Sequence, residues 1–83
     1  MNNAGYVDRF GNAITNIESA GEDASTVRVP GKVQCDIRGY YQGAPRGEPL
    51  ALTGSSGFLE IAVNGGNAAQ IFALALGDAV EVR

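Results

Sequence analysis

Residues 26–38 read TVRVPGKVQCDIR, and this stretch decides the fold class. On both sides of Pro30-Gly31, β-branched residues alternate with polar ones, which is the pattern of strands that bury one face. Proline fixes its own φ and glycine accepts a positive φ, so the pair is typical of a tight turn. The stretch therefore predicts a β-hairpin. In its second strand, residues 32–38, the side chains expected to point inward are Val33, Cys35 and Ile37.

Other short strands are expected on either side of this hairpin. Alternating or apolar runs predict strands at residues 13–17, 50–52, 58–63 and 79–82, after an opening apolar segment at 6–7. In the strand at 58–63, only Glu60 is expected to be exposed. Glycine-containing segments predict tight turns at 53–57 and 64–67, and loops at 19–25 and 39–49.

Only residues 68–74 are predicted to form a helix. Asn67 precedes them and is a suitable N-cap. A helix of about two turns is unstable alone, so its apolar face (Ala68, Ile71 and Phe72) is expected to pack against a sheet. Six or seven short strands and one short helix near the C-terminus predict an all-β fold, either a barrel or a sandwich with a helical plug.

The composition excludes several classes of function. The chain has 83 residues, which suits a single domain, and it contains no histidine and one cysteine. Without histidine, neither a Ser-His-Asp nor a Cys-His catalytic arrangement can form within the chain. Cys35 alone supplies neither an internal disulfide nor the roughly four nitrogen and sulfur ligands of a structural zinc site. We therefore expect no catalytic residue, no metal and no cofactor of its own.

The charge and hydropathy of the chain limit the classes of partner that we expect for it. The net charge is −3, without the basic footprint that nucleic-acid binding requires. No apolar run approaches the roughly 20 residues of a membrane span. The opening residues MNNAG lack the basic and apolar regions of a signal peptide. We expect a cytoplasmic protein with no nucleic-acid and no membrane partner, and a lone thiol suits that reducing compartment.

Three segments carry groups that could bind a ligand, and the first is the glycine bend of Asp8, Phe10 and Asn12. A phenyl ring can stack on a base, and a side-chain amide complements an adenine edge. A carboxylate can hold an ammonium group or a ribose hydroxyl. The same residues would also form an Asx-type turn in which Asp8 and Asn12 bond local backbone and Phe10 enters the core.

The other two segments are the glycine-rich turns. Backbone N–H groups at residues 53–57, together with the hydroxyls of Ser55 and Ser56, could hold an anion, although no lysine follows as in a Walker loop. Asn64, Asn67 and Ala68 lie where free N–H groups before a helix could bond a ring nitrogen or an anion. An ordinary strand-to-strand turn and simple helix capping explain these two segments equally well.

In their order along the chain, the three segments closely resemble the C-terminal domain of the S-adenosyl-L-methionine (SAM) hydrolases. These enzymes are also called SAM hydroxide adenosyltransferases and are relatives of the fluorinating and chlorinating enzymes. The matching runs are residues 5–17, 54–69 and 76–82, whereas the middle, about 20–49, matches loosely. The resemblance implies a small closed Greek-key β-barrel. It also implies a ligand held between this domain and the larger N-terminal α/β domain of a neighbouring subunit, typically in a trimer.

The resemblance also implies a role for each residue of the first two segments. Phe10 would stack on adenine, and the Asn12 amide would read the adenine edge. Asp8 would hold the amino group of the methionine moiety. Ser55, with the backbone of Ser56, would hold the methionine carboxylate.

In the third segment, the resemblance implies that the turn from Asn64 through Asn67 to Ala68 offers backbone groups to adenine. We expect all three segments to converge on one rim of a single closed sheet. Two positions depart from the family pattern. Ser56 stands where the halogenating members have an arginine, so in this position the chain resembles the hydrolase branch. Gly54 stands where the family usually has asparagine, so the resemblance does not fix the exact shape of that turn.

The function expected from the resemblance is binding without catalysis. The family's water-activating Asp, Arg and His lie in the N-terminal domain, so this chain would not hydrolyse SAM by itself. We expect a stand-alone module that binds adenosine or SAM weakly and covers its apolar surface by self-association, with a trimer favoured. One alternative is half of a SAM hydrolase site, completed by a separate N-terminal domain, that converts SAM and water into adenosine and methionine. Another is a structural or interaction module with a vestigial pocket.

Overall fold

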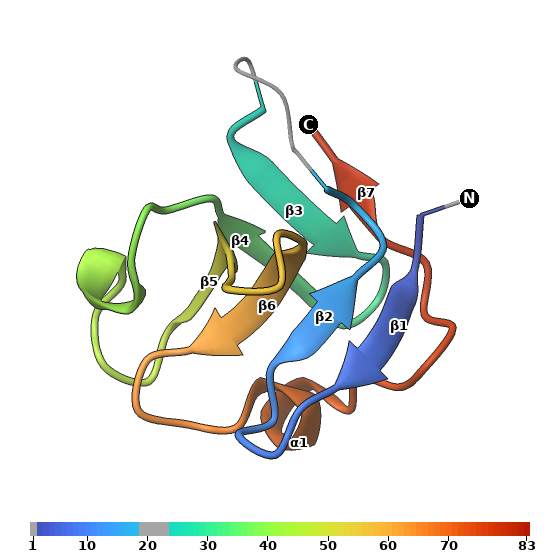
Figure 1. The fold of residues 1–83 in the computed structure, drawn as a ribbon. Coiled ribbons are helices and arrows are strands. Elements are labelled where there is room, and N and C mark those ends of the chain that lie inside the picture. Colours follow the sequence, from blue (N-terminus) through green and yellow to red (C-terminus); the bar gives the residue numbers. More distant parts are fainter. Residues whose placement is uncertain (1, 19–23) are drawn as a thin grey trace.

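The computed structural model of the chain describes residues 2–18 and 24–83. The predicted β-rich fold with one short α-helix is confirmed (Figure 1). The elements are β1 (Ala4–Val7), β2 (Ala13–Thr15), β3 (Thr26–Val29), β4 (Val33–Asp36), the 3₁₀-helix η1 (Tyr41–Gly43), β5 (Pro49–Thr53), β6 (Leu59–Val63), α1 (Ala68–Phe72) and β7 (Glu81–Val82).

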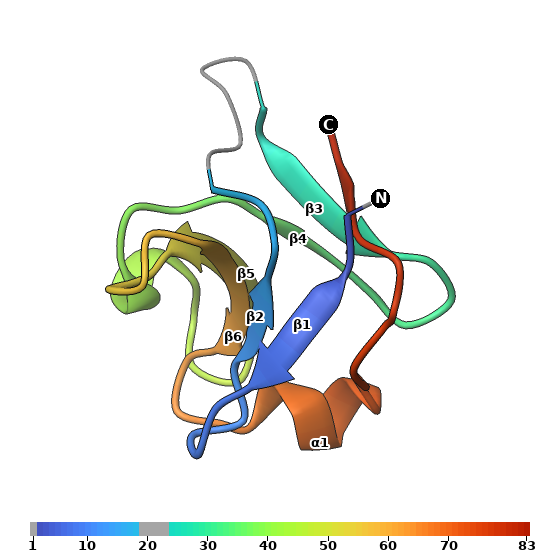
Figure 2. The ribbon, with the colours of Figure 1, turned by 45° about the vertical axis from the view of Figure 1, so that its right-hand side comes forward.

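The strands form two antiparallel sheets, ordered β1-β2-β6-β5 and β4-β3-β7. The predicted hairpin is confirmed as β3 and β4, with Val29 paired to Val33 across the turn. Gly31 has a φ of 79°, as the Pro-Gly turn requires, and the Lys32 N–H donates to the Val29 carbonyl at 2.9 Å. Helix α1 lies across one end of β1 and β2 (Figure 2).

The predicted closed barrel is not confirmed, because between the two sheets the described residues form isolated bridges and no continuous ladder. Ile37 bridges Ala51 in parallel fashion at one seam, and Asn3 bridges Ala79 at the other. At the first seam the Arg38 N–H donates to the Ala51 carbonyl at 2.7 Å. The preceding rung of a parallel ladder would need an N–H from Pro49, and proline has none. The β4–β5 seam therefore cannot form a continuous ladder.

The core lies between the two sheets. Its most deeply buried large side chains are those of Val27, Leu59 and Ile61. Cys35 belongs to the same cluster, as predicted, and burial raises the pKa of its thiol to about 11, with the neighbouring Asp36 charge adding to the effect. The thiol is therefore neutral at physiological pH and packs as a small apolar group. Leu50 belongs to a second, smaller cluster.

Two predicted orientations are wrong. Glu60 is only 6% exposed, because β6 is a central strand with β2 on one side and β5 on the other. Ile71 is 55% exposed, because the short helix turns only part of its apolar surface inward. Ala68 is fully buried, and Phe72 packs partly buried against the core, as expected.

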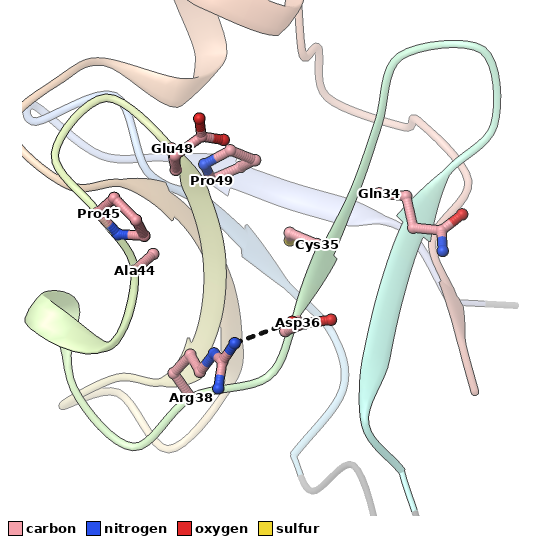
Figure 3. Close-up of a pocket in the computed structure, with 8 residues that line it drawn as sticks. All are labelled: Gln34, Cys35, Asp36, Arg38, Ala44, Pro45, Glu48 and Pro49. Carbon is pink, nitrogen blue, oxygen red and sulfur yellow. Dashed lines mark hydrogen bonds and ion pairs between the residues drawn. The ribbon is translucent and has the colours of Figure 1, made fainter.

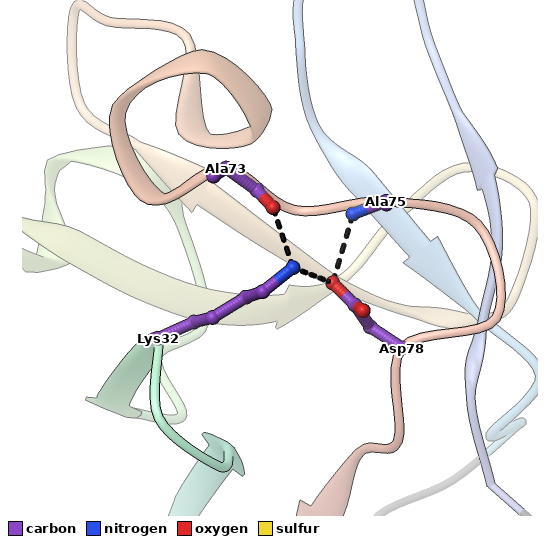
Figure 4. A network of polar contacts seen from close by, with 4 residues as sticks. All are labelled: Lys32, Ala73, Ala75 and Asp78. Carbon is purple, nitrogen blue, oxygen red and sulfur yellow. Dashed lines mark hydrogen bonds and ion pairs between the residues drawn. The ribbon is translucent and has the colours of Figure 1, made fainter.

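Helix α1 ends two residues before the predicted end. Ala73 adopts the left-handed conformation with a φ of 54°, and its N–H donates to the Ala69 carbonyl. The ammonium group of Lys32 reaches this helix end and donates to the Ala73 carbonyl at 2.6 Å and to Asp78 Oδ2 at 2.7 Å (Figure 4). Asp78 also accepts from the Ala75 N–H at 2.8 Å. These bonds lower the pKa of the Asp78 carboxyl and fix the helix end against the β3–β4 turn.

The remaining differences concern boundaries. Strands predicted at 13–17, 32–38 and 79–82 are shorter in the structure, because their end residues leave the ladders. The predicted loop at 39–49 contains η1. Of the predicted loop at 19–25, residues 19–23 lie outside the described part of the chain. None of the described helices has the length and apolar character needed to cross a membrane.

Candidate functional site

Two of the three candidate segments meet at one end of the larger sheet. The bend between β1 and β2 follows Val7 and precedes Ala13, which pairs with Ile61 on β6. The segment that leaves β6 after Val63 therefore lies beside this bend, at the lower end of the sheet in Figure 1. A cavity of about 450 Å³ lies between them, lined by Phe10, Asn12, Gln42, Val63, Asn64, Gly65 and Gly66.

The cavity lining combines one aromatic ring with three side-chain amides and has no charged side chain. Phe10 is 62% exposed, so the alternative that places it in the core is wrong. Asn12 is buried at 5% exposure. The lining thus offers a flat apolar face beside donors and acceptors, which suits an uncharged polar ring.

Asp8 organises the bend that carries Phe10 and Asn12. Its Oδ1 accepts from the Phe10 N–H at 2.9 Å and from the Asn12 N–H at 3.0 Å. Its Oδ2 accepts from the Asn12 amide nitrogen at 3.4 Å. The predicted Asx-type role of Asp8 is therefore confirmed, while its contact with an amino group stays a prediction.

Gly11 fits this bend against helix α1. Its φ of 83° favours glycine, and a Cβ at this position would overlap the side chain of Asn67. The Ala69 N–H donates to the Gly11 carbonyl at 2.8 Å. Asn67 Oδ1 accepts from the Gln70 N–H at 2.9 Å, so its predicted N-cap role is confirmed. The side chain of Asn67 packs against Gly11 of the bend and does not line the cavity. The side chain of Ala68 is buried in the core.

Asn64 connects the opposite wall of the cavity to residues 44–47 by hydrogen bonds. Its amide nitrogen donates to the Ala44 carbonyl at 2.9 Å, and its own carbonyl accepts from the Gly47 N–H at 2.8 Å. These bonds hold the segment that follows η1 against the cavity. Gln42 of η1 completes the lining. Sequence reasoning missed Gln42, because no local pattern tells where a residue within the 39–49 loop will lie.

The prediction that the turn at residues 53–57 reaches the same rim is wrong. Ser55 and Ser56 lie in this β5–β6 turn, next to the rung where Thr53 pairs with Leu59. Asn64 follows the other end of β6, and five strand residues separate these ends by about 13 Å. The roles of the two serines toward a methionine carboxylate remain predictions, and they would require a ligand that extends along β6.

Gly54 opens this turn at a place where no side chain fits. A Cβ on Gly54 would overlap the carboxylate of Glu60, which lies buried beneath it. The Gly54 N–H donates to the Phe58 carbonyl at 3.0 Å and closes the turn. Glycine at this position, where the resemblance expects asparagine, is thus explained by the buried glutamate.

A second cavity, of about 320 Å³, lies at the open β4–β5 seam (Figure 3) and is lined by Gln34, Cys35, Asp36, Arg38, Ala44, Pro45, Glu48 and Pro49. The one cation in this lining, Arg38, points toward Asp36 and pairs with it at 2.9 Å. The thiol of Cys35 is neutral there and is no nucleophile. No group of three or more potential metal ligands occurs among residues 2–18 and 24–83. The site chemistry therefore concentrates in the first cavity.

Known proteins share the sequence pattern and the fold of this chain. The chain is 42% identical over 76 residues to the (R)-S-adenosyl-L-methionine hydrolase of Thermus thermophilus. It also matches two crystal structures. One is of a conserved hypothetical protein from Thermus thermophilus, with a TM-score of 0.87 and 36% identity. The other is of an uncharacterized conserved protein from Thermotoga maritima, with a TM-score of 0.80 and 35% identity.

The matches cover nearly all of this chain but only part of each relative. They span 92% of this chain and 28% of the hydrolase. For the crystal structures they span 99% and 98% of this chain and 34% of each relative. Residues 3–81 match the family described as the SAM hydroxide adenosyltransferase C-terminal domain. By this match and by the identity to the hydrolase, the chain belongs to the family of SAM hydroxide adenosyltransferase C-terminal domains.

Proposed function

We propose that this chain is an adenosine- or SAM-binding module whose base-binding site is the cavity between the Phe10 bend and the turn after β6. The observation that carries the proposal is the convergence of Phe10, Asn12 and Asn64 on one cavity of about 450 Å³. That volume is within the range of small-molecule sites, about 300–1,000 Å³. Family membership and the likeness to a SAM hydrolase support the same ligand.

In this proposal, the exposed ring of Phe10 stacks on adenine. The Asn12 amide, oriented by its bond to Asp8, reads the adenine edge. Backbone groups of Gly65 and Gly66 approach the base closely, because these residues have no side chains to keep it away. The uncharged lining favours a neutral base over a charged one.

The family resemblance assigns the water-activating Asp, Arg and His to a separate N-terminal domain. The chain has no histidine and spans 28% of the hydrolase that it resembles. We therefore propose that the domain binds the ligand and does not cleave it. Cleavage of SAM by water into adenosine and methionine would then need a second, catalytic domain, which supplies the activated water.

Self-association belongs to the same proposal. Large apolar side chains are exposed at Tyr6, Phe10, Tyr40, Ile71 and Leu76. A neighbouring subunit or a catalytic domain would cover part of this surface, and the family resemblance favours a trimer. The bridges at both seams also support a single barrel-like domain. A free buried thiol suits a cytoplasmic protein.

The test is calorimetric titration of the chain with adenosine. We expect a Kd in the micromolar to millimolar range, about −8 to −4 kcal/mol, because only half of the ligand would be contacted. Phe10→Ala is expected to weaken binding by about 5- to 150-fold, since stacking on an aromatic ring contributes about 1–3 kcal/mol. Tyr6→Ala is the control, because Tyr6 is similarly exposed at 59% but does not line the cavity.

Absence of binding at millimolar adenosine would favour the interaction module with a vestigial pocket. An equal loss of affinity in both variants would also contradict the proposed site, because only Phe10 lines the cavity.

A further inference from the structure

The seam between β4 and β5 exposes part of a strand edge. β4 lies at the edge of the three-stranded sheet and β5 at the edge of the four-stranded sheet. The Ile37 N–H donates to the Ser25 carbonyl at 2.8 Å, and the Arg38 N–H donates to the Ala51 carbonyl at 2.7 Å. Because neighbouring N–H groups of a strand point to opposite sides, the N–H and the carbonyl of Gln34 face the seam, as the Arg38 N–H does.

The backbone of Gln34 has no hydrogen-bond partner across the seam in the part of the chain that the structure describes. The ladder position opposite its carbonyl belongs to Pro49, which has no N–H to donate. Gln34 is also exposed. An exposed strand edge with a free donor and a free acceptor is a template for pairing with another chain.

The cavity of about 320 Å³ lies along this edge (Figure 3). Cys35 and Ala44 are buried and give its lining an apolar part, and Pro45 and Pro49 add rings without N–H groups. None of its lining residues lines the first cavity. The edge therefore borders a space that can receive side chains of an added strand, apart from the proposed base site.

The charges of this lining favour a basic occupant. The lining contains two carboxylates, Asp36 and Glu48, and one guanidinium group, that of Arg38. Arg38 pairs with Asp36 at 2.9 Å, whereas Glu48 makes no ion pair with any residue that the structure describes. Pairing with β4 of a second copy would bring together two such seams from chains that each carry a charge of −3. Charge complementarity therefore favours a basic partner over a second copy.

We propose that the β4–β5 seam binds an extended, basic segment of another polypeptide. The segment adds as a strand beside Gln34 and places a lysine or arginine near Glu48. In this mode of recognition, backbone hydrogen bonds supply affinity and side-chain contacts supply specificity. The inference does not depend on the nucleoside ligand, because the two cavities share no lining residue.

The experiment titrates the isotope-labelled chain with a capped peptide of sequence TVKVKVT and follows the backbone amide shifts. We expect saturable binding at millimolar peptide, with shifts at Gln34 and Glu48. The matched peptide TVEVEVT is expected to bind about 3- to 10-fold more weakly, because an exposed attraction becomes a repulsion. Glu48→Gln is expected to bring this ratio towards 1. Glu18→Gln is the matched control and keeps the ratio, because Glu18 is an exposed carboxylate that does not line the cavity.

Alternate N-methylation of the peptide tests strand pairing without altering the protein. A strand that joins one edge uses the N–H groups of every second residue. N-methylation of that set is expected to weaken binding by at least about 10-fold, since two or three hydrogen bonds are lost, and N-methylation of the other set by less than about 2-fold.

Two substitutions of Gln34 test the same pairing from the side of the protein. Gln34→Pro removes the seam-facing N–H and no bond of the β3–β4 ladder, so it is expected to weaken peptide binding by about 2- to 10-fold. Gln34→Ala keeps the N–H and is expected to bind as the parent chain does.

Three results would overturn the inference while leaving the proposed function intact. They are absence of binding at millimolar TVKVKVT, equal affinities for the basic and the acidic peptide, and equal losses from the two N-methylated sets. Shifts at Gln34 that depend on protein concentration without peptide would also overturn it, because they would assign the seam to a second copy. Failure of adenosine to bind would instead overturn the proposed function.

Discussion

Gly11→Ala is expected to lower the free energy of unfolding by about 2–3 kcal/mol and to abolish measurable adenosine binding. The positive φ of 83° costs an alanine about 1–2 kcal/mol. The new Cβ would also displace Asn67, and loss of that N-cap costs about 1 kcal/mol. The bend that carries Phe10 would move away from α1, so the cavity would lose one wall. Urea unfolding and calorimetry measure the two effects.

Gly31→Ala separates the cost of a positive φ from the cost of displacing Asn67. Gly31 has a similar φ of 79°, but no atom lies within 4 Å of the position of its Cβ. This variant is expected to lose about 1–2 kcal/mol of stability, from the backbone alone, and to keep its affinity for adenosine. Equal stability losses in the two variants would mean that the fit of Gly11 against Asn67 contributes nothing.

Ile61→Ala is expected to cost about 2–5 kcal/mol, the range for removing a large aliphatic side chain from a core. Ile61 is fully buried on the central strand β6, between both sheets. A domain of this size has about 4–12 kcal/mol of stability in total, so the variant is expected to lose a large share of it. The midpoint of urea unfolding and the near-ultraviolet circular dichroism measure this loss.

Ile71→Ala makes the same chemical change at a position that is 55% exposed. Its effect is expected to stay within about 0.5 kcal/mol, as for other surface substitutions. A comparable loss at Ile61 and Ile71 would contradict the placement of the core between the two sheets.

The sequence predicted those parts of the fold that depend on local pattern. The β3–β4 hairpin follows from alternation on both sides of Pro30-Gly31, and the N-cap of α1 follows from Asn67. The burial of Glu60 could not be predicted in this way, because it depends on the neighbours of β6 and on the space above Gly54. The open seam between β4 and β5 could have been anticipated from Pro49, because proline has no N–H to donate to a ladder.

The sequence predicted the candidate site correctly only for the segments that the strand pairing brings to the same end of the sheet. Phe10, Asn12 and Asn64 come together because β2 pairs with β6, so the turns at the same ends of these strands adjoin. Ser55 and Ser56 share the glycine-rich character of the other turns, but composition does not tell at which end of a strand a turn lies.

The most direct test of the shared cavity is the change in backbone amide chemical shifts when isotope-labelled protein is titrated with adenosine. Shifts are expected at Phe10, Asn12 and Gln42 and at residues 64–66, while the amides of Ser55 and Ser56 stay unchanged. Shifts confined to the second cavity, around Arg38 and Glu48, or to only one of the two walls would contradict the account.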